Sequence, residues 1–393
     1  MKSIKTLLFN FAVLMLFTCV SCSKEKTMTK GNILTIETNE SIDLKLSELF
    51  DTLLIVPLEA TEKSFIGRIS KVITTKQYIF VLDNSIAESL FIFDYDGRII
   101  NSFQGTGSGP GEYIRVSNFI LSHDEKSVFI KDHSLGKILE LDLNGEVIRD
   151  LSFSEGIGYH DLYPFEDGFY AVLPADNNIG VKIDILDADL KSTGVTIPIK
   201  ESDIKIEDEF KNQYFYRGSN GEILFKRKVD NTLSYINEND SSTFVEFSFD
   251  KNEFNTLDIP WNKGAEAIHQ DNVINEIWLN NFYAFSDQII DLKDYTLFNV
   301  WHGKSWKILA MNKLTLEARF IDKMENDMDG LIANIPGIFP ANANANQMVL
   351  DIAPDDLFSL NAVLENPTKY SDRIREVEKQ IVENPVLFIY RNN

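Results

Sequence analysis

The chain has 393 residues and a formal net charge of −22 at pH 7, from 60 Asp and Glu against 38 Lys and Arg. Such an acidic surface repels phosphate backbones and anionic lipids, which disfavours sequence-independent nucleic-acid binding, so no nucleic-acid partner is expected. The two cysteines, Cys19 and Cys22, both lie within the first 22 residues, so the rest of the chain has no disulfide framework.

The N-terminus predicts an exported protein. Lys2 and Lys5 precede an apolar run at 7–17 that is too short to span a bilayer and ends in "TCVSC", which indicates a signal peptide over residues 1–22. Cys22 and the "SKEK" after it resemble the lipobox of bacterial lipoproteins, which implies lipidation of Cys22 and an outer-membrane address on either face. Because Cys19 stands where the lipobox prefers leucine, signal cleavage without lipid is the alternative. Residues 23–32 are polar and predict a flexible tether to a single domain over 33–393.

From about residue 52 onward, short apolar runs alternate with Asp, Asn and Gly turns, which is typical of an all-β fold. A repeat is present, because "GRISKVI" at 67–73 aligns with "IRVSNFI" at 114–120, and "YIFVLD" at 78–83 with "SVFIKD" at 127–132. Each unit continues into a hairpin with an Asp-Gly or Asn-Gly turn, at 90–103 and 138–153. Such a repeating unit is typical of a β-propeller blade.

The hairpin recurs at 183–199, 233–249 and 306–321, and an insertion near 250–276 explains one longer spacing. Strands at 346–352 and 385–391, joined by an N-terminal strand at 51–59, complete the ring. We therefore predict a six-bladed β-propeller of four-stranded antiparallel blades, with seven blades as the alternative, whose last blade is closed by the N-terminal strand. Apolar residues at helical spacing predict a short C-terminal helix within 367–383.

The stretch "GTGSGPGEY" at 105–113 lies between the outer strand of the first blade and the inner strand of the second. It lacks the spacing of a phosphate-binding loop, and a strand follows it, so it predicts a compact crossover. It resembles the inter-blade signature of NHL-type propellers. Together with "NDMDG" at 326–330, "ENPVLFIY" at 383–390 and the lipoprotein signal, it also resembles the six-bladed propeller lipoproteins of Bacteroidetes. That resemblance implies the fold and leaves the activity unassigned.

Candidate binding residues are expected at the mouth of the central channel, where propellers place ligands. The repeat alignment puts Arg68 and Arg115 there, and Tyr159 and His160 begin the third blade. Such a set suits carboxylate-bearing or sulfated ligands. The alternative is that these side chains pair with nearby acids and fill the funnel.

Metal and cofactor sites find little support in the sequence. The histidines are scattered singly without zinc spacing, so we predict no metal site and no cofactor. Residues 325–330 match the start of a calcium loop, but Pro336 stands where a bidentate Glu is required. Calcium is therefore a minor alternative to a solvated acidic loop.

The four tryptophans lie in or near the insertion and the fifth blade. Trp261 is a candidate for stacking on a sugar or peptide, with core packing as an equal alternative, whereas Trp278 and Trp306 are expected in the core. Trp261 therefore joins the candidate ligand-binding residues.

Two function classes follow. The favoured one is a lipid-anchored cell-envelope propeller that acts as a binding or scaffold module for a glycan, peptide or envelope protein. The alternative is a propeller hydrolase or lyase with a site at the mouth of the channel.

Overall fold

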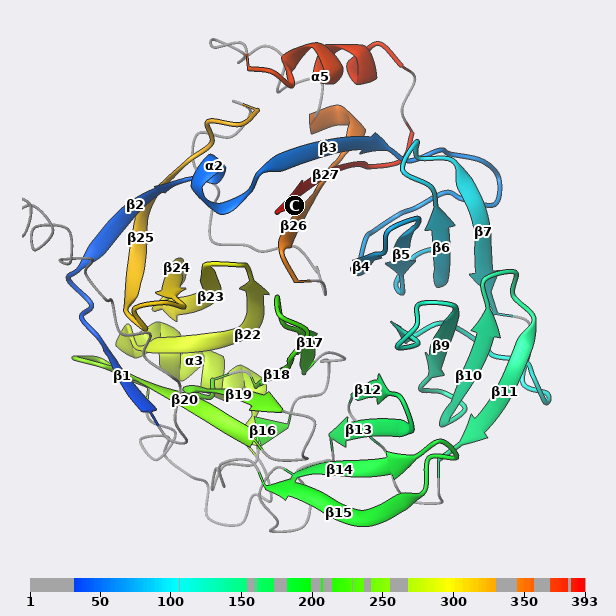
Figure 1. Cartoon of the computed structure of the whole chain (residues 1–393), viewed down its shortest axis with the longest axis horizontal. Coiled ribbons are helices and arrows are strands. Elements are labelled where there is room, and N and C mark those ends of the chain that lie inside the picture. Colours follow the sequence, from blue (N-terminus) through cyan, green and yellow to red (C-terminus); the bar gives the residue numbers. More distant parts are fainter. Residues whose placement is uncertain are drawn as a thin grey trace, which may run out of the picture.

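The computed structural model describes residues 32–105, 107–153, 159, 161–172, 182–198, 206–207, 214–227, 229–236, 242–254, 268–329, 345–356, 368–380 and 383–392. Six β-sheets are arranged like blades around a common axis (Figure 1). The predicted all-β, six-bladed propeller is confirmed.

The first three blades are four-stranded antiparallel sheets in chain order, with the first strand nearest the axis (Figure 1). Blade one comprises β4 (Lys71–Thr74), β5 (Ile79–Asp83), β6 (Ser89–Phe93) and β7 (Ile99–Gln104). Blade two comprises β8 (Asn118–Leu121), β9 (Ser127–Asp132), β10 (Lys137–Asp142) and β11 (Val147–Ser152). Blade three comprises β12 (Leu162–Phe165), β13 (Gly168–Val172), β14 (Lys182–Asp187) and β15 (Ser192–Pro198).

Glycine turns close the hairpins of the first two blades where the sequence predicts them. Gly97 and Gly145 have φ values of 84° and 92°, which side chains with a Cβ rarely adopt. The Asp-Gly and Asn-Gly predictions are therefore confirmed.

Blades four and five each carry a fifth strand. Blade four comprises β17 (Phe215–Arg217), β18 (Ile223–Lys226), β19 (Thr232–Ile236) and β20 (Ser242–Phe249). Blade five comprises β22 (Tyr283–Asp291), β23 (Tyr295–His302), β24 (Ser305–Asn312) and β25 (Ala318–Glu325). Outside them, β1 (Asn32–Ile36) pairs in parallel with β20, and β2 (Ser41–Lys45) pairs in parallel with β25.

Blade six closes the ring with both ends of the chain. Its described strands are β26 (Gln347–Ile352), β27 (Val386–Arg391) and β3 (Thr52–Pro57), and β3 pairs along its whole length with β27. Closure of the last blade by the N-terminal strand, predicted for 51–59, is confirmed. The start of β26 contacts the ends of two inner strands, because the Asn346 N–H donates to the Asp291 carbonyl and Thr74 bonds Gln347. β26 therefore runs in the direction of the second strands of the other blades.

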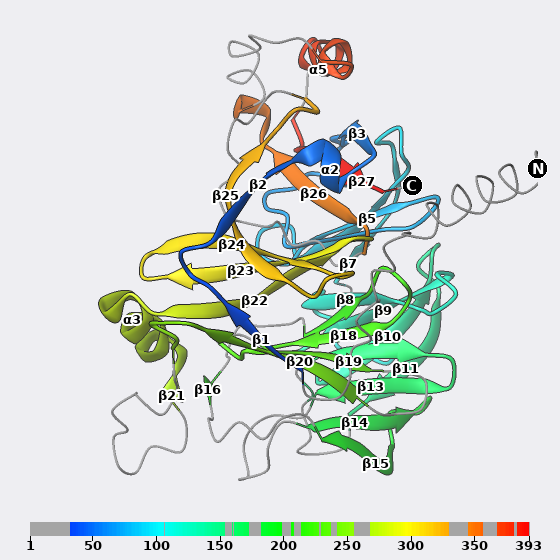
Figure 2. The same cartoon turned by 60° about the vertical axis from the view of Figure 1, so that its left-hand side comes forward.

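The N-terminal segment 32–57 thus forms a belt along the rim of blades four, five and six, which Figure 2 shows beside β20 and β25. An unpaired outer strand presents free N–H and C=O groups, and β1 and β2 cover the outer edges of β20 and β25 in blades four and five, whereas β3 is itself the outer strand of blade six. Only the part in blade six was predicted from the sequence.

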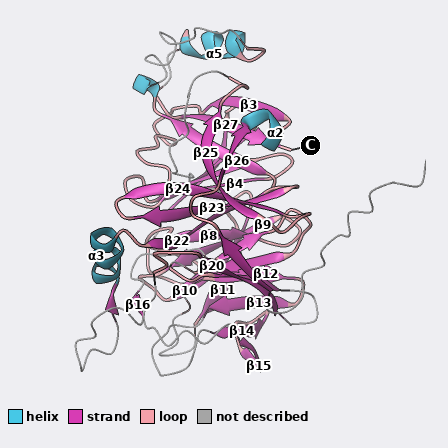
Figure 3. Ribbon diagram, turned by 90° about the vertical axis from the view of Figure 1, so that its left-hand side faces the viewer, coloured by secondary structure: helices cyan, strands magenta, loops and turns pink. Residues whose placement is uncertain are grey.

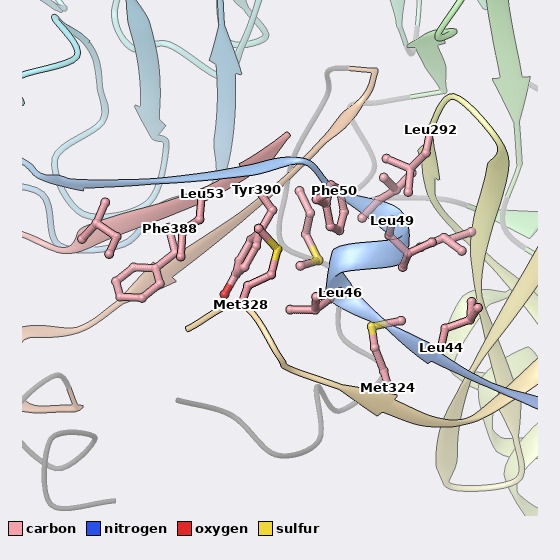
Figure 4. Packing of buried hydrophobic residues seen from close by; sticks show 14 of the residues in the cluster. Leu44, Leu46, Leu49, Phe50, Leu53, Leu292, Met324, Met328, Phe388 and Tyr390 are labelled. Carbon is pink, nitrogen blue, oxygen red and sulfur yellow. The ribbon is translucent and has the colours of Figure 1, made fainter. Parts of the chain in front are cut away.

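Hydrophobic clusters between adjacent blades form the core. One of them packs the short helix α2 (Leu46–Leu49) and Phe50 of the belt against Met324, Met328 and Tyr390 (Figure 4). Packing of large apolar side chains in this way is the main stabilising contribution to such interfaces.

Outside the blades the structure has α3 (Gln270–Asn280), α5 (Ser371–Glu378) and a short parallel pair, β16 (Ile206–Glu207) with β21 (Ile268–His269) (Figure 3). Ile374 and Val377 of α5 are fully buried, so the predicted C-terminal helix is confirmed. Within the described residues, no helix combines the length and apolar character that a membrane span requires. Residues 1–31 and 255–267, which include Cys22, the predicted tether up to 31 and Trp261, lie outside the described residues.

Candidate functional site

We call the side of the ring on which β4, β8 and β17 begin the entry face. The turns between second and third strands lie on the same face, because second strands run antiparallel to the inner ones. Arg68 and Arg115 precede β4 and β8, so both lie on the entry face, at equivalent positions of blades one and two.

Two buried aspartates fix these positions. The Oδ2 atom of Asp83, at the end of β5, accepts the main-chain N–H groups of Gly67 (2.8 Å) and Arg68 (2.9 Å). Its Oδ1 accepts those of Ser85 (3.1 Å) and Ile86 (2.9 Å) in the next turn. Burial alone would raise the pKa of Asp83, but the N–H donors outweigh it and hold this pKa below its usual value.

Asp132 repeats the arrangement in blade two. Its Oδ2 accepts the N–H groups of Ile114 (2.6 Å) and Arg115 (3.4 Å), and its Oδ1 accepts that of Ser134 (2.8 Å). Each aspartate therefore joins the segment before an inner strand to the turn after a second strand. The backbone at both arginines is held in place by charge-assisted hydrogen bonds.

The two guanidinium groups differ in their partners. Arg68 is exposed and makes no ion pair with the described residues. Arg115 Nη1 lies 3.4 Å from Glu88 Oε1, in a pair whose side chains are 43% and 49% exposed, and such exposed pairs contribute little stability. Arg115 Nε is buried without a hydrogen-bond partner in the described part of the chain.

Large apolar side chains are exposed beside these arginines. Phe65, Ile86 and Ile114 have exposed fractions of 58%, 65% and 48%. A Cβ on Gly67 would lie 2.5 Å from the Cγ2 of Ile86, so the Ile86 side chain lies directly against this glycine, next to Arg68. We call the set Phe65, Arg68, Ile86, Ile114 and Arg115 the entry patch.

Beneath the entry patch, lysines connect neighbouring blades. Lys71 Nζ of β4 donates to Asn118 Oδ1 (3.1 Å) and to the Phe119 carbonyl (2.8 Å) of β8. Lys131 Nζ of β9 donates to the Tyr159 carbonyl (2.8 Å). These bonds satisfy buried main-chain carbonyls across two blade boundaries, which is a structural task.

Asp161 is the acidic member of this interior group. Its Oδ2 accepts the N–H groups of Tyr214 (2.6 Å) and Phe215 (3.0 Å) at the start of blade four. Burial raises the pKa of Asp161 despite Lys71 and these donors, and burial lowers the pKa of Lys71 to about 8 despite Asp161. Because every one of these groups bonds across a blade boundary, we assign the cluster to holding the ring together.

The other sequence-predicted residues do not gather with the arginines in the described structure. Tyr159 is buried between blades two and three, where its OH lies 3.3 Å from Asp184 Oδ2 of the third strand β14. His160 and Trp261 lie outside the described residues. The structure thus places Arg68 and Arg115 at equivalent positions of neighbouring blades, and Tyr159 between blades with its hydroxyl at a third strand.

Two expectations about the fifth blade are wrong. Trp278 and Trp306, expected in the core, are each 39% exposed, whereas Trp301 is buried and contacts Trp306 at 4.7 Å between ring centroids. For Trp278 the cause is the orientation of α3, which lies outside the sheet. This helix buries Val273 and Ile277 against Trp301, so the face that carries Trp278 points outward.

Within the acidic segment that was expected to be a solvated loop, Glu325 and Asp327 are exposed, but Asp329 departs from this expectation. Asp329 is fully buried and accepts hydrogen bonds from Asn326 Nδ2 and the Tyr390 hydroxyl. Asp327 accepts the N–H and hydroxyl of Ser47 in the belt. These acids therefore fasten the loop after β25 to both ends of the chain. Among the described residues, no group of three His, Cys, Asp or Glu side chains could hold a metal ion.

Asp83 and Asp132, which build the site, were not among the residues predicted from the sequence. A signal was present, since "FVLD" and "FIKD" place the two aspartates at the same position of the repeat. Phe65 and Ile86 gave no such signal, because exposure of a single apolar residue depends on the tertiary structure.

The comparisons with known proteins concern fold and family. No curated protein matches this chain. A solved structure described as "Putative exported protein" from Bacteroides fragilis NCTC 9343 is 15% identical, covers 91% of this chain and 99% of its own, and has a TM-score of 0.68. A member of the DUF4221 family from Bacteroides vulgatus ATCC 8482 is 13% identical, covers 87% and 96%, and has a TM-score of 0.47. Virginiamycin B lyase from Staphylococcus aureus is 13% identical, covers 69% and 73%, and has a TM-score of 0.37.

The first of these structures shows a shared fold alone, and the other two, with their lower TM-scores, carry no argument about function. A family model aligns with residues 32–391 of the chain. This chain belongs to the family described as Domain of unknown function (DUF4934).

Proposed function

We propose that this protein is an exported, lipid-anchored binding or scaffold module of the cell envelope, and that its entry face binds a partner through carboxylate or sulfate groups. The observation that carries the proposal is the pair Arg68 and Arg115, held at equivalent positions of neighbouring blades.

The physical support is the contrast between this site and the rest of the molecule. The chain has a net charge of −22, so most of its surface repels anions. Arg68 has no acidic partner among the described residues, and the guanidinium fork matches the geometry of a carboxylate or sulfate. An acidic ligand would therefore be directed to the entry patch by attraction there and by repulsion elsewhere.

The address is supported by the N-terminal sequence. Residues 1–22 have the pattern of a lipoprotein signal, and a protein of the same fold is described as exported. Replacement of Cys22 by Ser should move the protein from the detergent phase to the aqueous phase in a phase-partition assay of membranes from expressing cells. Equal partition of both proteins would contradict the anchor.

Binding is tested with anionic probes of defined chemistry. Poly-glutamate, hyaluronan and chondroitin sulfate, each labelled with a fluorophore, are titrated with the soluble domain at low salt. We expect at least one probe to bind the wild type and to lose affinity for the double variant Arg68→Glu, Arg115→Glu. The matched control is Arg98→Glu, an exposed arginine in the hairpin turn before β7. Equal binding by the wild type and the double variant, or by none of the proteins, would refute the proposal.

A further inference from the structure

We infer that the partner of the entry patch is a protein, and that it binds through a segment in which acidic residues alternate with branched aliphatic ones. This inference rests on the proposed function and names the partner class for the same site. It follows from the apolar members of the patch, from its fixed backbone and from its charge.

The apolar members are too exposed to serve the core. Phe65, Ile86 and Ile114 are about half exposed or more. Ile114 directly precedes Arg115, Ile86 lies against Gly67 beside Arg68, and Phe65 is three residues before Arg68. Exposed apolar side chains gathered beside cationic groups are typical of interaction surfaces. A purely anionic ligand would gain nothing from these three side chains.

The chemistry favours protein over sugar. Carbohydrates stack their faces on flat aromatic rings, but only Phe65 of the patch is aromatic. Ile86 and Ile114 present β-branched aliphatic groups, which pack well against Leu, Ile or Val of a partner. Arg115 follows Ile114 in the sequence, and Arg68 follows Gly67, against which Ile86 packs. A complementary segment of the partner would therefore carry Asp or Glu beside its aliphatic residues.

The patch is also preorganised across two blades. Ser70 Oγ donates to Asn84 Oδ1 (2.6 Å), and Asn84 Nδ2 donates to the Ser117 carbonyl (3.2 Å). The Ile66 N–H, next to Phe65, donates to the buried Asn384 Oδ1 (2.9 Å). A backbone fixed in this way loses little conformational entropy on binding, so a small surface can still select its partner.

The experiment is a selection of twelve-residue peptides displayed on phage against the purified soluble domain. Enriched peptides are synthesised and titrated against four double or single variants that separate charge from apolar contact. The charge variant combines Arg68→Glu with Arg115→Glu, and the apolar variant combines Ile86→Ser with Ile114→Ser. The single-substitution controls are Arg98→Glu and Ile148→Ser, and Ile148 is 53% exposed on the rim strand β11. Circular dichroism spectra confirm that each variant is folded.

We expect enriched peptides with Asp or Glu next to Ile, Leu or Val, and both patch variants should weaken them roughly ten- to hundredfold. The two controls should bind as the wild type does. Peptides whose binding depends on neither patch variant, or the absence of any enriched peptide, would overturn the inference. If the sulfated or carboxylated glycans bind in an arginine-dependent manner while peptides do not, the proposed function stands and the protein partner is wrong. If no anionic probe and no peptide depends on the arginines, both are wrong.

Discussion

Asn384 fastens the two ends of the chain together, and its replacement by Ala gives a quantitative test of how the ring is closed. The side chain is fully buried in the segment that leads into β27. Its Oδ1 accepts the Ile66 N–H, and its Nδ2 donates to the carbonyls of Glu59 (2.8 Å) and Ser64. One amide therefore satisfies three main-chain groups in the segment that follows β3.

The variant Asn384→Ala removes three hydrogen bonds and leaves the Ile66 N–H and the Ser64 carbonyl without this partner, whereas the Glu59 carbonyl keeps its bond from Ser64 Oγ (2.9 Å). Each bond contributes about 1 kcal/mol net, and an unsatisfied buried group costs about 1–3 kcal/mol. We expect the free energy of unfolding to fall by about 3–5 kcal/mol, a large part of the ~5–15 kcal/mol that a typical domain has.

The assay is urea unfolding followed by tryptophan fluorescence, with the loss taken from the midpoint shift at constant slope. The matched control is Asn144→Ala in an exposed turn, where the side chain bonds to Asp142 and to no other described residue, and the expected change is within about 0.5 kcal/mol. Asn384→Asp keeps an acceptor for Ile66 but turns an oxygen toward two carbonyl oxygens, so it should be at least as damaging as Ala. A loss below about 1 kcal/mol for Asn384→Ala would refute the reasoning.

Three further predictions concern stability. Burial lowers the pKa of Lys226 from 10.5 to about 7. Between about pH 7 and 10 the unfolded chain therefore binds more protons than the folded one, and the wild type should become more stable as the pH rises through this range. Urea titrations at each pH should show a smaller gain in stability for Lys226→Met. Gly105→Ala should lower the melting temperature by several degrees in calorimetry, because the new Cβ would lie 1.8 Å from the Ile114 carbonyl oxygen; an unchanged melting temperature would contradict this close approach within the crossover. Ile36→Ala in the belt should cost about 2–5 kcal/mol, since this side chain is fully buried, while the 65% exposed Ile33 of the same strand should tolerate Ala; equal costs in urea unfolding would contradict the placement of β1.

Much of the fold was predictable because its signals are local. Strand alternation and the turns at Gly97 and Gly145 repeat within each blade, and a repeat multiplies a weak signal. The helix α5 was also predictable from a local signal, since Ile374 and Val377 are spaced by about one helical turn and lie on one face of the helix. The crossover at 105–113 could also be interpreted, and the hydrogen bond from the Gly109 N–H to Glu112 Oε2 shows a loop held by its own side chain.

The belt could not be predicted beyond β3, because its partners are remote. Nothing within residues 32–45 identifies β20 and β25, and parallel pairing leaves no hairpin turn to detect. The site was predictable only in part for the same reason. Arg68 and Arg115 follow from the repeat, but the exposure of Phe65 and Ile86 depends on how several segments meet on the entry face.

The belt has a consequence for how the protein is made. Its contacts join Thr38 to Asp250, Ser47 to Asp327 and Thr52 to Arg391, over 212, 280 and 339 residues of sequence. Because synthesis proceeds from the N-terminus, β1, β2 and β3 are made first, long before the strands with which they pair. Contacts of such long range slow folding, and three unpaired strands with apolar residues are prone to aggregate in the meantime. The pairing of the belt can therefore be completed only after Arg391, the last residue of β27, has been added.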